Sequence, residues 1–334
     1  MFDHDKSPDG RGVLPLDHKH ATTAPHAIPT TKFVRPCERI EPDAREIEGF
    51  PTIAGRFAAL TSELPLAGAD AMRPSKNGDL EIVARLRACA PWCEPAIGLL
   101  DQQWLLQLWL GRPWITFRPL LLVGPPGCGK SHLARMIAER SGTGHSILSL
   151  SGVADPTSVE GTPRGYSSTM PCFPALAMAQ HSTANPIVVV EELDKACSNS
   201  RNGDPVAALL TLIEPGTARE YWDRCLLAPI DVSHVNWMCT ANSLDGLSPA
   251  LLSRMDIVRL TGPLLEHFDE LLVNLIGELA RGWGVPVAEL PSLANGAEKM
   301  LCKRFAKHRS VRRLNRELRD AMAASIQFGR RSVN

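Results

Sequence analysis

Apolar residues recur through the middle of the chain in short unbroken runs, with amphipathic stretches between them. The amphipathic stretches carry an apolar residue every three or four positions, which is the spacing of one helix face. The short runs have the length and character of buried strands: PLLLV (119–123), SILSLSG (146–152), PIVVVE (186–191), VNWMCTAN (235–242) and DIVRL (256–260). Buried strands that alternate with helices predict an α/β protein, an αβα sandwich with a five-stranded parallel sheet.

Two helices are predicted ahead of the sheet region, which we place at residues 119–262. EIVARLRACA and IGLLDQQWLLQLWLG have helical apolar spacing and form a helical lead-in segment, residues 76–118. We expect Trp104 and Trp109 of the second helix to pack against the core. Residues 1–75 hold nine prolines and show little periodicity, which predicts an irregular N-terminal arm with only short ordered pieces.

A small all-helical unit is predicted after the sheet, over residues 263–334. LLEHFDELLVNLIGELA and SVRRLNRELRDAMAASI place apolar side chains at helical spacing, and no strand-like run follows Gly262. This unit is also the basic end of the chain, since residues 299–331 hold eleven Lys or Arg and two acids. The whole chain has a formal net charge of zero, which argues against bulk electrostatic binding to nucleic acid or to an anionic membrane.

Hydropathy and cysteine usage predict the cellular compartment of the protein. No run of 18 apolar residues occurs, so no transmembrane helix is expected. The N-terminal stretch MFDHDKSPDGRG lacks the apolar region of a secretory signal. The nine cysteines form no pairing framework, and these features together predict reduced thiols in a cytoplasmic protein.

The segment GPPGCGKS, which follows the first apolar run, fits the phosphate-binding pattern G-x-x-x-x-G-K-[ST] at every fixed position. Glycines let backbone N–H groups converge on phosphates, and the N-terminus of the following helix adds its positive end. We expect Lys130 to reach the β- and γ-phosphates of ATP and Ser131 to offer its hydroxyl to Mg²⁺. The residues predicted to bind ATP are Gly124, Pro125, Pro126, Gly127, Cys128, Gly129, Lys130, Ser131 and His132.

Two adjacent carboxylates end the third predicted strand, in NPIVVVEELDKA. The carboxyl ends of parallel strands form the edge of the sheet where ligands bind. We therefore expect Glu191 to face the Mg²⁺ shell and Glu192 to act on the water that attacks ATP. The usual residue at the first position is aspartate, and Glu191 keeps its charge with one more methylene group.

In their order and spacing these motifs resemble those of AAA+ ATPases, and more narrowly the ATPase module of the Lon protease family. The resemblance covers roughly residues 119–320. It rests on GPPGCGKS, DPTSVEGTPRGYSSTMP, NPIVVVEELDKA, GDPVAALLTLIEP, CTANSLDGLSPALLSRMDIVRL and SVRRLNREL. It implies a P-loop NTPase domain with a helical lid, and a homo-oligomeric, hexameric ring with ATP at the subunit interfaces.

The resemblance also implies roles for four more residues. Asn242 is similar to the sensor 1 residue that helps orient the attacking water, and Arg312 to the sensor 2 arginine of the lid. Arg254 resembles the arginine finger given to the neighbouring subunit, and Tyr166 the pore-loop aromatic that grips a polypeptide. The next residue, Ser167, stands where Lon proteins carry an apolar residue.

The function implied is an ATPase that remodels or threads a protein partner. Lon proteases continue past the lid into a peptidase domain with a Ser–Lys dyad, whereas this sequence ends at Asn334. We therefore expect no peptidase of its own, and a protein substrate or a separate peptidase as partner. One alternative is an ATP-binding switch or scaffold in which Glu191 slows hydrolysis. Another is a DNA-associated ATPase that uses the basic C-terminal helices.

Overall fold

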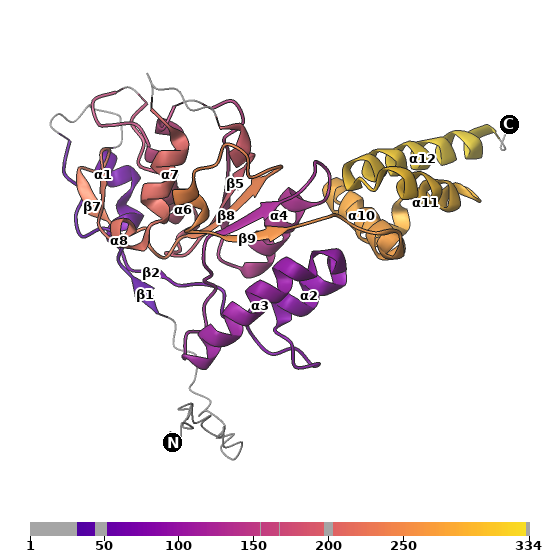
Figure 1. Ribbon diagram of the computed structural model, residues 1–334, viewed down its shortest axis with the longest axis horizontal. Coiled ribbons are helices and arrows are strands. Elements are labelled where there is room, and N and C mark those ends of the chain that lie inside the picture. The colour runs from indigo at the N-terminus through magenta and orange to yellow at the C-terminus, as the bar shows by residue number, and fades with distance from the viewer. Residues whose placement is uncertain (1–31, 44–51, 154, 167, 197–202, 332–334) are drawn as a thin grey trace, which may run out of the picture.

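The computed structural model describes residues 32–43, 52–153, 155–166, 168–196 and 203–331. At its centre lies a five-stranded parallel sheet in the order β4-β5-β8-β3-β9 (Figure 1). The strands are β3 (Leu120–Val123), β4 (His145–Ser149), β5 (Ile187–Glu191), β8 (Asn236–Ala241) and β9 (Asp256–Arg259). Each matches one of the predicted apolar runs, so the predicted αβα sandwich and its five strands are confirmed.

Each face of the sheet has its own buried core, because successive strand residues point in opposite directions. Leu120 and Leu122 of β3 belong to one cluster of buried residues, and Leu121 and Val123 to the other. The first face is covered by α2 (Glu81–Cys89), α3 (Glu94–Trp109) and α4 (Lys130–Ser141). The second is covered by α5 (Thr157–Glu160), α6 (Phe173–His181), α7 (Pro205–Ile213), α8 (Pro215–Ala218) and α9 (Pro249–Leu252).

Local sequence signals set the ends of these helices. Asp204 precedes α7, and its carboxylate accepts a hydrogen bond from the Val206 N–H at 2.8 Å, as an N-cap residue does. Gly142 ends α4 with a φ of 71°, a left-handed conformation that glycine adopts without a steric penalty. α4 begins at Lys130, directly after the glycine-rich loop that leaves β3.

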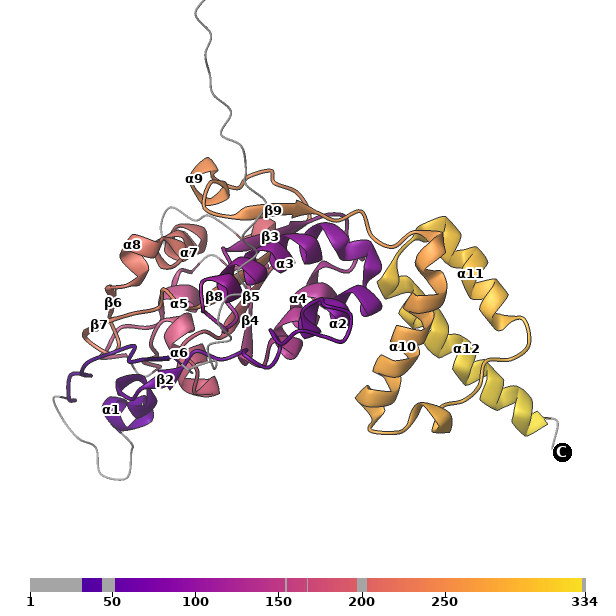
Figure 2. The same cartoon turned by 90° about the horizontal axis from the view of Figure 1, so that it is seen from below.

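The C-terminal part of the chain is a helical lobe beside the sheet (Figure 2). It consists of α10 (Phe268–Trp283), α11 (Ala297–His308) and α12 (Val311–Arg331), with short 3₁₀ turns at Leu265–His267 and Val287–Glu289. Phe305 and Leu314 are buried among apolar residues of α10 and of the first sheet face. The helical C-terminal region was predicted, although α11 had not been singled out as a helix.

The described part of the N-terminal segment is more integrated into the core than an irregular arm would be. β1 (Phe33–Val34) pairs with β2 (Leu64–Pro65), and α1 (Ile53–Arg56) and a 3₁₀ turn at Ala58–Thr61 lie between them. Leu60, Leu64 and Leu66 are fully or nearly fully buried in the second core. Leu60 and Leu64 are four residues apart and Leu64 and Leu66 two apart, so no single period runs through them, and the sequence predicted only short ordered pieces here. Residues 1–31 and 44–51 lie outside the described part of the chain.

Two further features depart from the expectations. A hairpin of β6 (Tyr221–Asp223) and β7 (Ala228–Ile230) lies between α8 and β8 and was not predicted. Trp104 is fully buried as expected, but Trp109 is 75% exposed, so its predicted packing against the core is wrong. Five residues on a helix are separated by about 140°, and the two side chains therefore leave α3 on different sides. None of the described helices is long and apolar enough to cross a membrane.

Candidate functional site

The glycine-rich loop between β3 and α4 fits tightly against its surroundings. Gly127 and Gly129 have φ values of 83° and 104°, in the region that favours glycine. A Cβ atom on Gly127 would lie 2.6 Å from the Ser310 hydroxyl at the start of α12. The Val311 N–H donates to the Gly127 carbonyl at 3.1 Å, so the first turn of α12 contacts the loop directly. The glycine-rich loop and the first turn of α12 are thus in direct contact.

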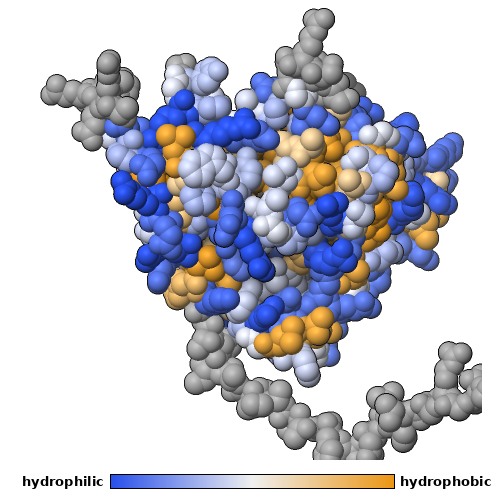
Figure 3. All heavy atoms as spheres, turned by 60° about the vertical axis from the view of Figure 1, so that its left-hand side comes forward, coloured by the Kyte–Doolittle hydropathy of each residue, from blue (hydrophilic) through white to orange (hydrophobic). Residues whose placement is uncertain are grey.

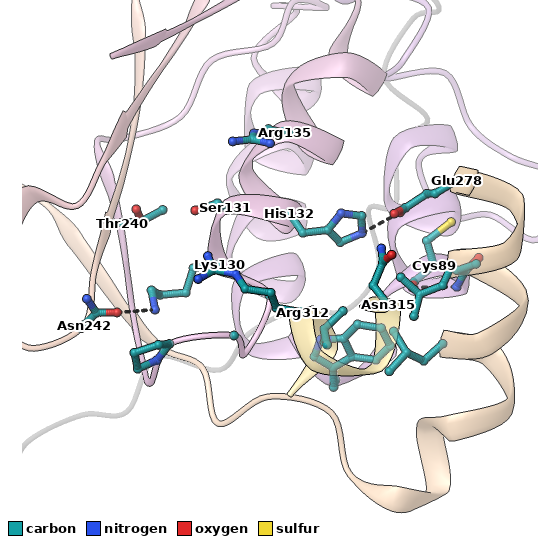
Figure 4. Close-up of a pocket in the computed structure, with 18 of the residues that line it drawn as sticks. Cys89, Lys130, Ser131, His132, Arg135, Thr240, Asn242, Glu278, Arg312 and Asn315 are labelled. Atoms are coloured by element: carbon teal, nitrogen blue, oxygen red, sulfur yellow. Dashed lines mark hydrogen bonds and ion pairs between the residues drawn. The ribbon is translucent and has the colours of Figure 1, made fainter. Parts of the chain in front are cut away.

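A cavity of about 380 Å³ opens over this loop, between the carboxyl edge of the sheet and the lid (Figure 4). Its walls combine the loop, two strand ends, the lid and the end of α2. The residues that line it include Cys89, Trp92, Pro126, Gly127, Gly129, Lys130, Ser131, His132, Arg135, Glu192, Thr240, Asn242, Glu278, Arg312 and Asn315. Most of the residues predicted from the motifs therefore meet at one cavity, although they come from four separate parts of the sequence.

Lys130 lies inside this cavity and is only 8% exposed. Its Nζ donates to the carbonyl oxygens of Gly124 (2.6 Å) and Pro125 (3.1 Å) and to the Asn242 Oδ1 (3.1 Å). Burial lowers the pKa of Lys130, because removal from water disfavours its charged form. An anionic ligand in the cavity would restore the lost stabilisation of that charge.

Asn242 is held at the end of β8 by an acid that sequence analysis did not single out. The Asn242 N–H donates to the Asp194 Oδ2 at 3.0 Å, while its side-chain oxygen accepts from Lys130. The Asp194 Oδ1 is buried and has no hydrogen-bond partner among the described residues. Asp194 also lies close enough to favour the charged form of Lys130.

Glu192 follows β5 in a left-handed conformation, with a φ of 59°, which is uncommon for a residue that is not glycine. Its N–H donates to the Thr240 Oγ1 at 3.2 Å, and its carboxylate accepts from the Lys195 Nζ at 2.6 Å. Hydrogen bonds from Lys195 and then Ser151 lower the pKa of Glu192 below its ordinary value. Both donors therefore stabilise the ionised form of this carboxylate at the cavity wall.

Glu191 has a different environment from the one expected. Its Oε1 accepts from the Arg135 Nη2 at 2.9 Å, and it is not among the residues that line the cavity. Arg135 does line the cavity, as does Ser131 one helical turn before it. The oxygens at the wall, from Ser131, Glu192 and Asn242, are hard donors of the kind that Mg²⁺ prefers, so the cavity fits a magnesium nucleotide.

Four further predicted residues lie in the cavity or in the loop beneath it. Arg312 enters the cavity from the first turn of α12, and His132 lines it while its Nε2 lies 3.2 Å from the Glu278 Oε1 of α10. Cys128 is buried under the loop, and Gly124 packs against the Leu260 carbonyl so closely that a Cβ would collide with it.

Arg254 and Tyr166 lie away from the cavity walls. Arg254, between α9 and β9, forms an ion pair with Glu214 and donates to the Ala250 carbonyl at 2.8 Å. Tyr166 is 67% exposed in the loop between Thr162 and Met170, which bridge to each other. Ser167 lies outside the described residues.

The Tyr166 loop is anchored at its base. Arg164 donates through Nε to the Cys225 carbonyl at 2.9 Å and through Nη1 to the Glu41 carbonyl at 2.7 Å. These contacts tie the loop to the β6–β7 hairpin and to the N-terminal segment. The anchor explains how an exposed aromatic side chain can be presented on a short loop.

Trp92 and Arg135 are cavity residues that sequence analysis missed. The Trp92 Nε1 is buried without a hydrogen-bond partner among the described residues, and its ring lies 5.9 Å from that of His267. No motif marks Trp92, because it precedes the loop by more than thirty residues. Arg135 could have been found, since a residue four positions after Ser131 lies on the same helix face.

Comparison with known proteins agrees with this geometry. Residues 120–263 match the model of the ATPase family associated with various cellular activities (AAA). The chain therefore contains an AAA domain, and the sheet, the loop and most of the cavity lie within it.

The chain is also similar to Lon proteases. It is 35% identical to the Lon protease of Neorickettsia sennetsu over 215 residues, which are 62% of this chain and 25% of that protein. It is 39% identical to the peroxisomal Lon protease homolog 2 of Pichia angusta over 153 residues, 45% of this chain and 16% of that protein. The chain thus spans a quarter or less of the length of these relatives.

A solved structure confirms the fold. It is titled as the closed state of Hsp104 with ATPγS and FITC-casein, and it matches with a TM-score of 0.55 at 16% identity. The match covers 71% of this chain and 45% of that chain. At this identity the likeness concerns the arrangement of helices and strands.

Proposed function

We propose that this protein binds ATP with Mg²⁺ in the cavity over the glycine-rich loop, hydrolyses it, and uses the cycle to remodel a protein partner. The observation that carries the proposal is the meeting of Lys130, Glu192, Asn242 and Arg312 at one cavity. These residues come from α4, the end of β5, the end of β8 and α12. The AAA domain and the similarity to Lon proteases support it.

The loop and four side chains of the cavity have a chemical task in this proposal. The loop N–H groups and the positive end of α4 bind the phosphates, and Lys130 exchanges its carbonyl and Asn242 contacts for phosphate oxygens. Glu192, ionised beside Lys195, accepts a proton from the attacking water. Asn242, fixed by Asp194, orients that water, and Arg312 connects the nucleotide to the lid.

Magnesium would neutralise charge on the phosphates and would be held by the Ser131 hydroxyl. The same role was predicted for Glu191, and its contact with Arg135 competes with that role. The base of the nucleotide would find Trp92 and the lid at the other end of the cavity. The buried Trp92 N–H gives this end a hydrogen-bond donor for a polar ligand atom.

The action on a partner is proposed from two residues outside the cavity. Arg254 would enter the nucleotide site of a neighbouring subunit in a ring, which we expect to be hexameric, after leaving Glu214. Tyr166, exposed on its anchored loop, would contact a polypeptide in the channel of that ring. The absence of a peptidase and a cytoplasmic location, both expected from the sequence, stay predictions.

The experiment is steady-state ATP hydrolysis by the wild type and by the Glu192→Gln variant, with ATP binding measured in parallel. The expected result is a loss of about a hundredfold or more in turnover, because general-base catalysis contributes a factor of that order to the rate. ATP binding should persist. Equal turnover in the two proteins at every protein concentration would contradict the motor and favour the ATP-binding switch. Tyr166→Ala should keep ATP hydrolysis and lose action on an unfolded protein substrate.

A further inference from the structure

Arg135 stands on the same face of α4 as Ser131, one turn further along the helix. Figure 4 shows its side chain leaving α4 on the same side as those of Ser131 and Lys130. Its Nη2 donates to the Glu191 Oε1 at 2.9 Å, the length of a charge-assisted hydrogen bond. The guanidinium is therefore held at a defined place although the side chain is 49% exposed.

Of the two charged side chains, the one that faces the cavity decides which charge a ligand contacts. Arg135 lines the cavity and Glu191 does not, and the Glu191 side chain is only 18% exposed. A ligand that enters the cavity therefore meets the cation, while the acid stands behind it. Held in this way, a guanidinium offers fixed N–H donors that match phosphate oxygens.

The unusual length of Glu191 explains why this pair can form. An aspartate at the same position would withdraw its carboxylate by about 1.5 Å, the length of one C–C bond. The contact to Arg135 would then stretch to about 4.4 Å without backbone movement, beyond hydrogen-bonding range. The additional methylene group of Glu191 thus brings its carboxylate within hydrogen-bonding distance of Arg135.

We infer that Arg135 is a second phosphate-binding cation of the nucleotide site, and that Glu191 is the positioning residue that orients it. This inference rests on the proposed binding of ATP in the cavity. It gives Glu191 a task that needs no metal ion. In this arrangement two cations contact the phosphates. Lys130 contacts them from the glycine-rich loop, and Arg135 contacts them from the face of α4 that carries Ser131.

The two roles of Glu191 predict different behaviour in the absence of metal. A magnesium ligand affects ATP binding only when Mg²⁺ is present. A residue that orients Arg135 affects ATP binding in EDTA as well. The measurement is therefore the ATP dissociation constant by titration calorimetry, with and without Mg²⁺, for wild type, Arg135→Gln, Glu191→Gln and the double variant.

In EDTA we expect each single substitution to weaken ATP binding by about tenfold, the effect of one partly exposed charged hydrogen bond. The double variant should be no weaker than Arg135→Gln, because Glu191 acts through Arg135. Glu191→Asp should behave as Glu191→Gln, since the shorter acid does not reach Arg135. Arg140→Gln is the matched control: it removes a charge from the same helix, at a residue that does not itself line the cavity and donates instead to the Sγ of Cys89, a residue of the cavity wall, at 3.3 Å.

Three outcomes overturn the inference. Unchanged metal-free affinity in Arg135→Gln means that the guanidinium does not bind phosphate. A loss in Glu191→Gln that appears only with Mg²⁺ means that Glu191 is a metal ligand. Additive losses in the double variant mean that the two side chains act separately. Failure of the wild type to bind ATP under any condition would instead refute the proposed function itself.

Discussion

At the scale of single residues, the protonation of Glu192 depends on neighbours that no motif identifies. Its backbone leaves β5 in a left-handed turn, which brings the carboxylate to the Lys195 Nζ three residues later. The hydrogen bond from Lys195, followed by that from Ser151, lowers the pKa of Glu192. If Glu192 is the general base, as proposed, it works only when ionised, so ATP hydrolysis should be present above its pKa and disappear as the pH falls through it.

Lys195→Met should therefore move the acid limb of the pH–rate profile for ATP hydrolysis to higher pH. In the wild type we expect this limb below the ordinary glutamate pKa of 4.5, because Lys195 lowers the pKa of Glu192, and without Lys195 it should move toward that value. Lys195→Arg keeps a positive donor and should keep the wild-type profile. Circular dichroism at each pH separates loss of chemistry from unfolding. Coinciding acid limbs in wild type and Lys195→Met would show that another group controls the profile.

At the scale of elements, the sequence of α3 predicts a helix but not the orientation of that helix. Its stretch WLLQLWLG is apolar on nearly every side, so the spacing predicts a helix without stating which face is buried. The structure buries Trp104 completely and exposes Leu105, Leu106 and Trp109 to 49%, 57% and 75%. The packing of α3 against Phe117 and the first sheet face selects the orientation, and it involves residues distant in sequence.

The two tryptophans of α3 should differ sharply in their contribution to stability. Trp104→Ala removes a fully buried ring and should lower the free energy of unfolding by about 3–5 kcal/mol. Trp109→Ala, on the exposed side of the same helix, should change it by less than about 1 kcal/mol. Urea unfolding followed by circular dichroism measures both. Equal losses would mean that Trp109 is covered in solution, for instance by another copy of the chain.

At the scale of the whole molecule, the sequence predicted the features that depend on residues close together in the chain. Each buried strand could be predicted because a run such as IVVVE is apolar on both faces, and GPPGCGKS needs its loop between a strand and a helix. The contact of Glu191 with Arg135 joins β5 to α4 over 56 residues, and no local pattern encodes it. The same is true of Trp92 at the cavity and of Leu64 in the core.

Arg254 bears on how copies of the chain would act together. It stands outside the cavity of its own chain and is paired with Glu214. In a ring with head-to-tail contacts, one face of each subunit meets the opposite face of the next, so a side chain can complete a neighbour's site. If Arg254 does this, the catalytic unit is the interface, with the cavity from one chain and the arginine from another.

Mixing two inactive variants tests this arrangement. Lys130→Ala has a defective cavity and an intact Arg254, and Arg254→Ala has the opposite, so each alone should lose ATP hydrolysis. In an equimolar mixture, about a quarter of randomly formed interfaces combine an intact cavity with an intact arginine. The mixture should therefore recover up to about a quarter of wild-type turnover once subunits exchange, and Lys130→Ala mixed with a Lys130→Ala, Arg254→Ala double variant should recover none. No recovery in subunits shown by mass to have co-assembled would mean that Arg254 acts within its own chain.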